Sequence, residues 1–176
     1  MRIVRHGGVA RRRNVSTRSN SCESRRASFS MNTQSDFEDF LRLLESNRVE
    51  YMIVGGYAVA FHGFPRFTKD IDIFFAGTRE NSSRLQAALV AFGFQKSTVP
   101  LESLEKPGAL VVIGVEPVRI DLLNQIDGIT FDEARPNVVR GRYGSVDVTF
   151  IGMNDLIRNK RSTGRTRDLG DIEELS

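Results

Sequence analysis

Two aspartates, Asp70 and Asp72, are the residues of this chain whose type and spacing most directly predict chemistry. They alternate with apolar residues in the stretch D-I-D-I-F-F, a pattern that predicts a β-strand. Because successive side chains of a strand point to opposite faces of its sheet, both carboxylates are expected on one face. Carboxylate oxygens are ligands that Mg²⁺ prefers, and bound Mg²⁺ commonly bridges to substrate phosphates. The pair therefore predicts metal-assisted chemistry on a phosphate compound.

A glycine pair, Gly55-Gly56, precedes the aspartates by thirteen residues and follows the apolar run 51–54. Backbone N–H groups at the start of a helix are a natural binding place for phosphate. Taken alone, the pair would indicate a plain turn between a strand and a helix. The aspartates that follow favour the phosphate-binding interpretation.

A third acid, Asp121, lies in the apolar stretch R-I-D-L-L, where a carboxylate is unusual unless it is paired or bound to metal. If its strand neighbours that of Asp70 and Asp72, all three carboxylates converge. They could then hold two Mg²⁺ ions, and Asp121 could accept a proton from the attacking group. Two alternatives remain open, namely a surface position for Asp121 and an edge strand with protective charges for the other two.

Apolar periodicity predicts an α+β fold with a mixed sheet of four to six strands and helices packed mainly on one face. The first helix is expected to begin at Ser35, the N-cap of a capping box that Glu38 completes. The expected elements, in chain order, are helix 36–47, strand 51–54, helix 57–62, the strand of Asp70 and Asp72, helix 81–92, hairpins 109–123 and 138–150, and helices 155–161 and 167–175.

The chain divides by composition into a basic segment, residues 1–32, and a single domain, residues 33–176. Eight arginines and one acid give residues 1–30 a net charge of +7, so the total of +3 leaves −4 for the rest. The segment is poor in large apolar residues, which predicts disorder. Three interpretations stay open for it: a dispensable extension, a basic arm for nucleic acid, or an organelle transit peptide.

The remaining composition predicts a globular protein of a reducing compartment. The hydrophobic fraction is 40%, and the apolar runs are too short to span a bilayer, so no membrane association is expected. The one cysteine, Cys22, excludes a disulfide within the chain. We therefore expect a cytoplasmic location.

The glycine and aspartate motifs together resemble a known signature. The order of parts is similar to the motif of the DNA polymerase β-like nucleotidyltransferase superfamily: a hydrophobic residue, Gly55-Gly56, a spacer, and then Asp70-Ile-Asp72-Ile. The wider form G-G-Y-A … R-F-T-K-D-I-D resembles its small, minimal branch, which includes the AbiEii-like toxins of toxin–antitoxin systems. The stretches 155–160 (D-L-I-R-N-K) and 167–171 (R-D-L-G-D) resemble later motifs of that branch. The similarity extends over about residues 36–175.

The resemblance implies a nucleotidyltransferase-like fold and transfer of a nucleoside monophosphate from an NTP. It implies that Mg²⁺, as one or two ions, is the cofactor, with Asp70, Asp72 and Asp121 as catalytic and metal-binding residues. The acceptor is open, and a tRNA 3′ end, a protein hydroxyl or a small molecule such as an aminoglycoside would all fit. The alternative is a catalytically silent module of the same fold that binds nucleotide or a partner, as in a toxin–antitoxin pair.

Five residues are expected to contact the nucleotide. The resemblance implies that Gly55 and Gly56 meet the triphosphate. Many relatives have a serine where this chain has Gly56, so only backbone donors remain here. It also implies that Lys160 reaches the phosphates, although a solvated helix residue is an equal alternative. Arg66 and Lys69 stand beside the aspartates in sequence, and either could neutralise phosphate charge.

Overall fold

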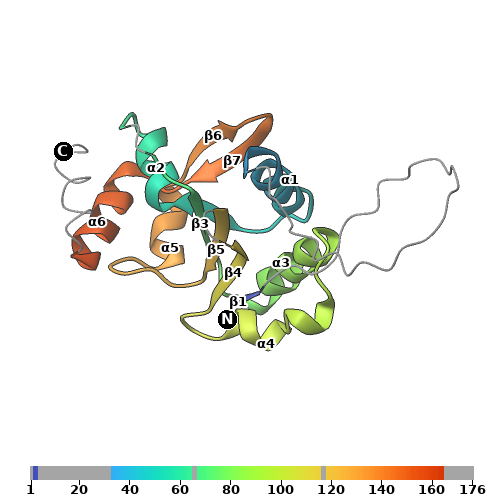
Figure 1. The fold of residues 1–176 in the computed structure, drawn as a ribbon. Helices are drawn as coiled ribbons and strands as arrows, with labels where there is room; N and C mark the ends of the chain where they lie inside the picture. Colours follow the sequence, from blue (N-terminus) through green and yellow to red (C-terminus); the bar gives the residue numbers. More distant parts are fainter. Residues whose placement is uncertain (1, 4–32, 65–66, 116–117, 165–176) are drawn as a thin grey trace, which may run out of the picture.

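The computed structural model describes residues 2–3, 33–64, 67–115 and 118–164 (Figure 1). The predictions for Arg66 and for a helix at 167–175 concern residues outside these ranges. The elements are β1 (Arg2–Ile3), α1 (Thr33–Ser46), β2 (Tyr51–Val54), α2 (Gly55–Phe61), β3 (Asp70–Phe75), α3 (Arg79–Ala91), α4 (Leu101–Glu105), β4 (Leu110–Val115), β5 (Val118–Leu123), α5 (Phe131–Ala134), β6 (Val139–Tyr143), β7 (Val146–Phe150) and α6 (Met153–Thr163), with short 3₁₀ helices at Lys96–Thr98 and Arg135–Asn137.

The strands form one mixed sheet in the order β1-β4-β5-β3-β2-β7-β6. β4 and β5 pair as an antiparallel hairpin, as do β6 and β7, and β2 lies antiparallel to β3. β5 lies parallel to β3, and β7 is parallel to β2. The predicted α+β fold with a mixed sheet is therefore confirmed.

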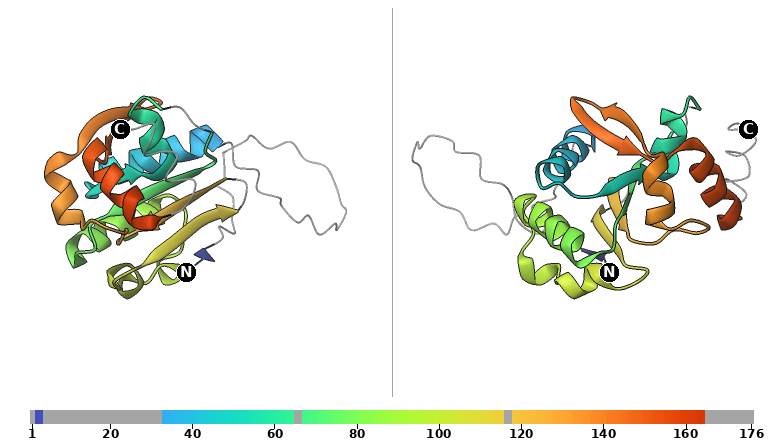
Figure 2. Two further views of the ribbon diagram at one scale, coloured as in Figure 1. Left: turned by 90° about the vertical axis from the view of Figure 1, so that its left-hand side faces the viewer. Right: turned by 180° about the vertical axis from the view of Figure 1, so that it is seen from behind.

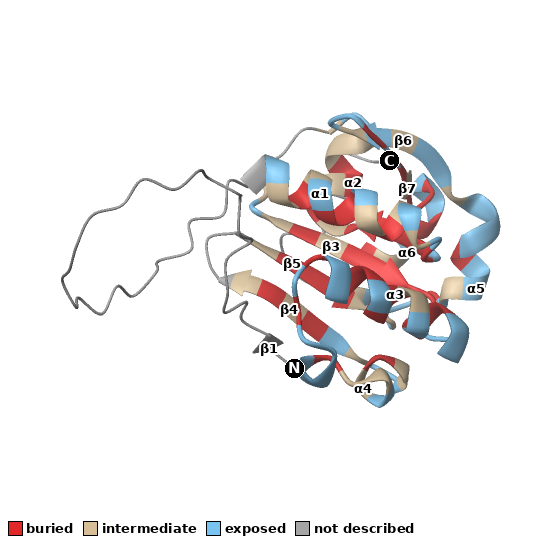
Figure 3. Ribbon diagram, turned by 90° about the vertical axis from the view of Figure 1, so that its right-hand side faces the viewer, coloured by how far each residue is buried: buried red, intermediate tan, exposed pale blue. Residues whose placement is uncertain are grey.

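Helices cover the two faces of the sheet unequally. The two longest helices, α1 and α3, lie together on one face with α4 (Figure 3), where the buried surface of the strands meets them. The shorter α5 and the helix α6 lie on the opposite side, beside α2 (Figures 1 and 2). The ring of Phe131 in α5 packs edge-on against Phe74 of β3 at 5.2 Å between centroids. Phe74 shares its side of the strand with Asp70 and Asp72, so α5 and the carboxylates are on the same face.

A buried asparagine ties the central strands to α3. Asn81, with 1% of its surface exposed, donates hydrogen bonds of 2.9 Å to the carbonyl oxygens of Glu50 and Ala76. Its Oδ1 accepts a 2.7 Å hydrogen bond from the backbone N–H of Glu50. Glu50 precedes β2 and Ala76 follows β3, so one side chain holds the adjacent ends of both strands.

The start of α1 differs from the predicted capping box. The helix begins at Thr33, so Ser35 lies inside it instead of at its N-cap. Glu38 instead accepts a 3.2 Å hydrogen bond from the backbone N–H of Ser145, in the β6–β7 turn. The local pattern predicted a contact of Glu38 with the start of its own helix, whereas the structure shows a tertiary contact with a distant turn, which local sequence does not encode.

Two residues of the basic segment are described, and they form a short strand at the edge of the sheet. Arg2–Ile3 form β1, which pairs in parallel with Val112 and Ile113 of β4. An edge strand offers unpaired backbone groups, and two residues can satisfy them without an apolar side-chain pattern. Residues 4–32 are outside the described ranges, so the prediction for them stays a prediction. Within the described residues, no helix has the length and apolar character needed to cross a membrane.

Candidate functional site

The parallel pairing of β3 and β5 places the three aspartates on two adjacent strands. Asp72 lies in register with Asp121, and Asp70 lies in register with Arg119. Residues in register on neighbouring strands share a face, so all four side chains project from the same side of the sheet. Asp121 is buried with 8% of its surface exposed, whereas Asp70 and Asp72 are half-buried.

Arg119 is a member of this cluster that the sequence interpretation missed. Its Nε lies 3.1 Å from Oδ1 of Asp121 and 3.3 Å from Oδ2 of Asp70. Burial raises the pKa of Asp121 above its ordinary value, while the positive charge of Arg119 opposes that rise and the charge of Asp70 adds to it. The signal was present in R-I-D, because strand alternation puts residues two apart on one face.

Gly55 begins α2 directly against one of these carboxylates. Its φ of +64° belongs to the left-handed region that favours glycine. A Cβ added at this position would overlap Oδ2 of Asp72 and lie 2.8 Å from its Cγ. Val54, the residue before it, pairs with Asp72 across β2 and β3. Gly55 and Asp72, predicted to act together, are thus in close contact.

The predicted phosphate-contacting cations are placed differently from one another. Lys69 is exposed, and its Nζ lies 5.8 Å from the ring centroid of Phe67, which is 83% exposed. Lys160 is buried in α6, with 3% of its surface exposed, and α6 contacts α2. A solvated position for Lys160, the alternative considered from sequence, is therefore excluded. Its role, like that of Lys69, stays a prediction.

The donor set of the cluster fits Mg²⁺ as an ion that arrives with substrate phosphate. Oδ1 of Asp70 is buried and accepts no hydrogen bond from the part of the chain described, which leaves a hard oxygen available. Among the described residues, however, no three acidic, histidine or cysteine side chains converge as a ready cage for an ion. Mg²⁺ is usually held by one or two carboxylates plus substrate phosphates, so a closed protein cage is not required.

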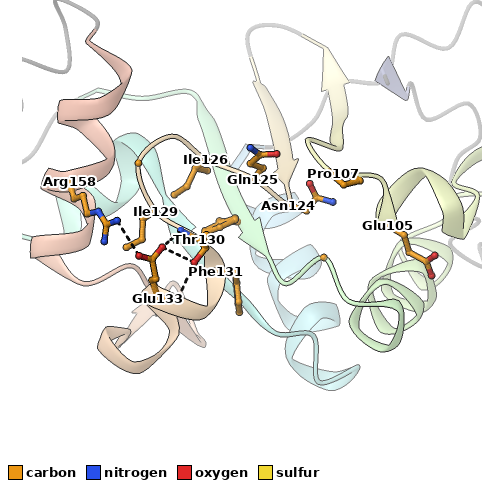
Figure 4. A pocket seen from close by; sticks show the side chains of 13 residues that line it. Glu105, Pro107, Asn124, Gln125, Ile126, Ile129, Thr130, Phe131, Glu133 and Arg158 are labelled. Atoms are coloured by element: carbon orange, nitrogen blue, oxygen red, sulfur yellow. Dashed lines mark hydrogen bonds and ion pairs between the residues drawn. The ribbon is translucent and has the colours of Figure 1, made fainter.

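A cavity of about 570 Å³ opens at the carboxyl-terminal ends of β3 and β5, lined by α5 and α6 of the carboxylate face and also by Glu105 at the end of α4 (Figure 4). We call it the α5 cavity. It begins at Phe74, two residues beyond Asp72 on β3, a distance of about 7 Å along a strand. The lining residues are Phe74, Gly77, Glu105, Pro107, Asn124, Gln125, Ile126, Gly128, Ile129, Thr130, Phe131, Glu133 and Arg158.

The sequence interpretation treated the region of this cavity only as a loop or short helix. The missed signal was the T-F-D-E stretch at 130–133, which forms a complete capping box between Thr130 and Glu133. Hydrogen bonds from the backbone and side chain of Thr130, and then from Arg158, lower the pKa of Glu133 to about 2.

Comparison with solved structures supports the fold. A candidate nucleotidyltransferase from Thermotoga maritima superposes with a TM-score of 0.53 at 11% sequence identity, covering 78% of this chain and 88% of that one. At this identity the likeness concerns the fold alone. A search of curated proteins gives no match to the chain.

The family of nucleotidyl transferases of unknown function, DUF2204, matches residues 33–176. This match agrees with the superfamily that the glycine and aspartate motifs predicted. The closer likeness to AbiEii-like toxins stays a prediction. The chain therefore belongs to the DUF2204 family of nucleotidyl transferases.

Proposed function

We propose that this protein transfers a nucleoside monophosphate from an Mg²⁺-bound NTP to a hydroxyl acceptor. The observation that carries the proposal is the placement of Asp70, Asp72 and Asp121 on one face of two adjacent strands, with Gly55 against Asp72. Bound Mg²⁺ would supply positive charge to the phosphates and lower the pKa of the acceptor hydroxyl.

In this reaction an acceptor oxygen bonds to the α-phosphorus, and the bond from that phosphorus to the bridging oxygen of pyrophosphate breaks. The pyrophosphate leaves with the bonding electrons. Asp121 is suited to take the acceptor proton, since burial holds its pKa above the ordinary aspartate value. Lys160 and the backbone of Gly55 and Gly56 would bind the pyrophosphate part.

Arg119 favours a second candidate, a nucleotide-binding module without turnover. Its guanidinium already neutralises Asp70 and Asp121. For catalysis, this side chain must move or share the carboxylates with the ion. A protein that binds Mg²⁺-NTP but keeps Arg119 in place would act through binding alone.

Isosteric substitutions test the proposal. We expect Mg²⁺-NTP to raise the melting temperature of the wild type but not of Asp72→Asn or Asp121→Asn. Asp147→Asn is the matched control, because Asp147 is a strand aspartate with a 78% exposed side chain that faces Arg142 at 3.4 Å, away from the cluster.

A transfer assay then separates the two candidates. The protein is incubated with each α-³²P-labelled NTP and with tRNA, protein or aminoglycoside acceptors. Transfer that requires Asp72 and Asp121 supports the enzyme, and binding without transfer to any acceptor supports the silent module. A wild type that shows no response to Mg²⁺-NTP contradicts both.

A further inference from the structure

The α5 cavity is a preformed feature of the fold, held by contacts between the segment after β5 and helix α6. The side-chain amide of Asn159 donates a 2.9 Å hydrogen bond to the carbonyl oxygen of Asp127. Gly128, at φ +79°, lies so close to α6 that an added Cβ would overlap Oγ of Ser162. Because this wall is already fixed, a ligand that enters would pay little to order it.

The lining has the chemistry of a site for a flat, uncharged group. The rings of Phe74 and Phe131 meet edge-on, and Ile126 and Ile129 add apolar surface. Its volume of about 570 Å³ is within the range of about 300–1,000 Å³ that is typical of small-molecule sites. The side chain of Gln125 is exposed and is available to hydrogen-bond the edge of such a group.

The charges around the cavity disfavour an anionic occupant. Glu105 and Glu133 both line it, and the cation Arg158 lies 3.1 Å from Glu133. Glu105 pairs in turn with Arg79 at 3.5 Å, so a triphosphate placed there would face two carboxylates and compete with them for cations that are already paired. The phosphates therefore belong at the other end of this face, near Gly55, and the cavity suits an uncharged part of the substrate.

The arrangement of the strands gives the direction of the substrate. Gly55 approaches Asp72 from the β2 side, whereas Asp121 is on β5, on the opposite side of β3. In an in-line transfer the acceptor and the pyrophosphate lie on opposite sides of the α-phosphorus. If pyrophosphate lies on the β2 side, the acceptor enters from the β5 side, and the line that joins them crosses the strands. The nucleoside is attached to the α-phosphate and extends away from that axis. The α5 cavity lies further along β3 from the place of the α-phosphate.

We propose that the α5 cavity holds the base of the nucleoside triphosphate, with Phe131 as its stacking partner and Gln125 at its polar edge. This inference rests on the proposed function, because it takes the α-phosphate to lie at the three aspartates. It assigns base recognition to the segment between β5 and α5 and to α6.

Calorimetry with two probes tests the assignment. The affinities of the wild type and of Phe131→Leu are measured for Mg²⁺-ATP, -GTP, -CTP and -UTP and for Mg²⁺-tripolyphosphate, which has no base. Leucine keeps an apolar contact with Phe74 but cannot stack. We expect the variant to bind the preferred NTP about tenfold more weakly, as loss of one base–aromatic stack predicts, with tripolyphosphate affinity unchanged.

A second pair of variants avoids any packing change. Gln125→Ala should alter the ranking of the four NTPs, while Gln95→Ala, an exposed glutamine outside the cavity, should not. The inference is overturned if Phe131→Leu weakens both probes equally, if it weakens neither, or if the wild type binds tripolyphosphate as tightly as any NTP. The last result would leave the proposed function standing, whereas a wild type that binds neither probe would overturn both.

Discussion

Nε of Arg119 lies 3.1 Å from Oδ1 of Asp121, two residues further along β5 and on the same face. The same nitrogen lies 3.3 Å from Oδ2 of Asp70. Two carboxylates crowded on one face repel each other, and the guanidinium offsets that repulsion. Arg119 thus places a positive charge where a substrate-bound metal ion would otherwise supply one.

Replacing this arginine should make the fold depend on added metal. Arg119→Met leaves Asp70 and Asp121 without their cation, so we expect stability at neutral pH to fall by about 1–2 kcal/mol, a modest value because the arginine side chain is one-third exposed. Added Mg²⁺ should then raise the melting temperature of the variant more than that of the wild type.

Arg142→Met is the control for this measurement, since Arg142 also pairs with a strand aspartate, Asp147, at 3.4 Å. Because this variant keeps Arg119 and the aspartates, its melting temperature should respond to Mg²⁺ as that of the wild type does. Equal Mg²⁺ shifts for the wild type and Arg119→Met would show that Arg119 does not stand in for an ion.

The contact between Gly55 and Asp72 predicts a loss of ligand binding that exceeds the loss of stability. Gly55→Ala introduces backbone strain of about 1–2 kcal/mol at φ +64° and also pushes its Cβ into the carboxylate. Gly164→Ala is closely matched in backbone, with φ +61°, and no atom of the described residues lies within 4 Å of an added Cβ. Gly55→Ala should lose more stability than Gly164→Ala in urea denaturation, because its Cβ also overlaps Asp72, but only Gly55→Ala should lose the thermal shift given by Mg²⁺-NTP. Retention of that shift would mean that the close approach has no role in binding.

Asn81 should matter for stability without affecting ligand chemistry. Asn81→Ala removes three hydrogen bonds and leaves backbone groups of Glu50 and Ala76 without their side-chain partner, so we expect a cost of about 3 kcal/mol. For a chain of this length that corresponds to roughly 6–12 °C in melting temperature. Ser83→Ala, on the exposed side of α3, should change little. A drop below about 1 kcal/mol would show that water replaces these bonds.

The capping box beside the α5 cavity predicts a pH-dependent contribution to stability. Hydrogen bonds from Thr130 lower the folded-state pKa of Glu133 from 4.5 to about 2. A depressed carboxylate pKa contributes stability above the unfolded-state value, and this contribution is lost as the pH falls through the folded-state value. The stability difference between the wild type and Glu133→Gln should therefore be largest at neutral pH and shrink between about pH 4.5 and pH 2. Urea denaturation across that range measures it, and a pH-independent difference would contradict the assignment.

Sequence alone predicted those features that depend on short-range pattern. Alternation in D-I-D-I placed Asp70 and Asp72 on one face, and the two hairpins were found close to their observed bounds. The sequence did not predict that β3 and β5 are neighbours; the convergence of the three aspartates was expected only if they were. Parallel strands are joined by long connections, so their pairing is decided by packing and is not encoded locally.

The features that were missed depend on tertiary context. Glu38 was assigned to a local cap but binds Ser145, more than a hundred residues away. The α5 cavity is built from β3, the segment after β5 and helices α4 to α6, so no single stretch of sequence predicts it. Arg119 could have been found by applying to R-I-D the alternation already used for D-I-D.

The in-register pairing of β3 with β5 has a consequence for folding as well as for chemistry. If β5 slipped by one residue, Arg119 and Asp121 would turn into the apolar layer beneath α1 and α3, at the cost of two buried charges. A slip by two residues toward the end of β3 would set Asp121 against Phe74. The charged side chains therefore penalise the wrong alignments before any ligand is present. Part of the selection on these positions would then act on folding fidelity, which a protein that had lost turnover would still need.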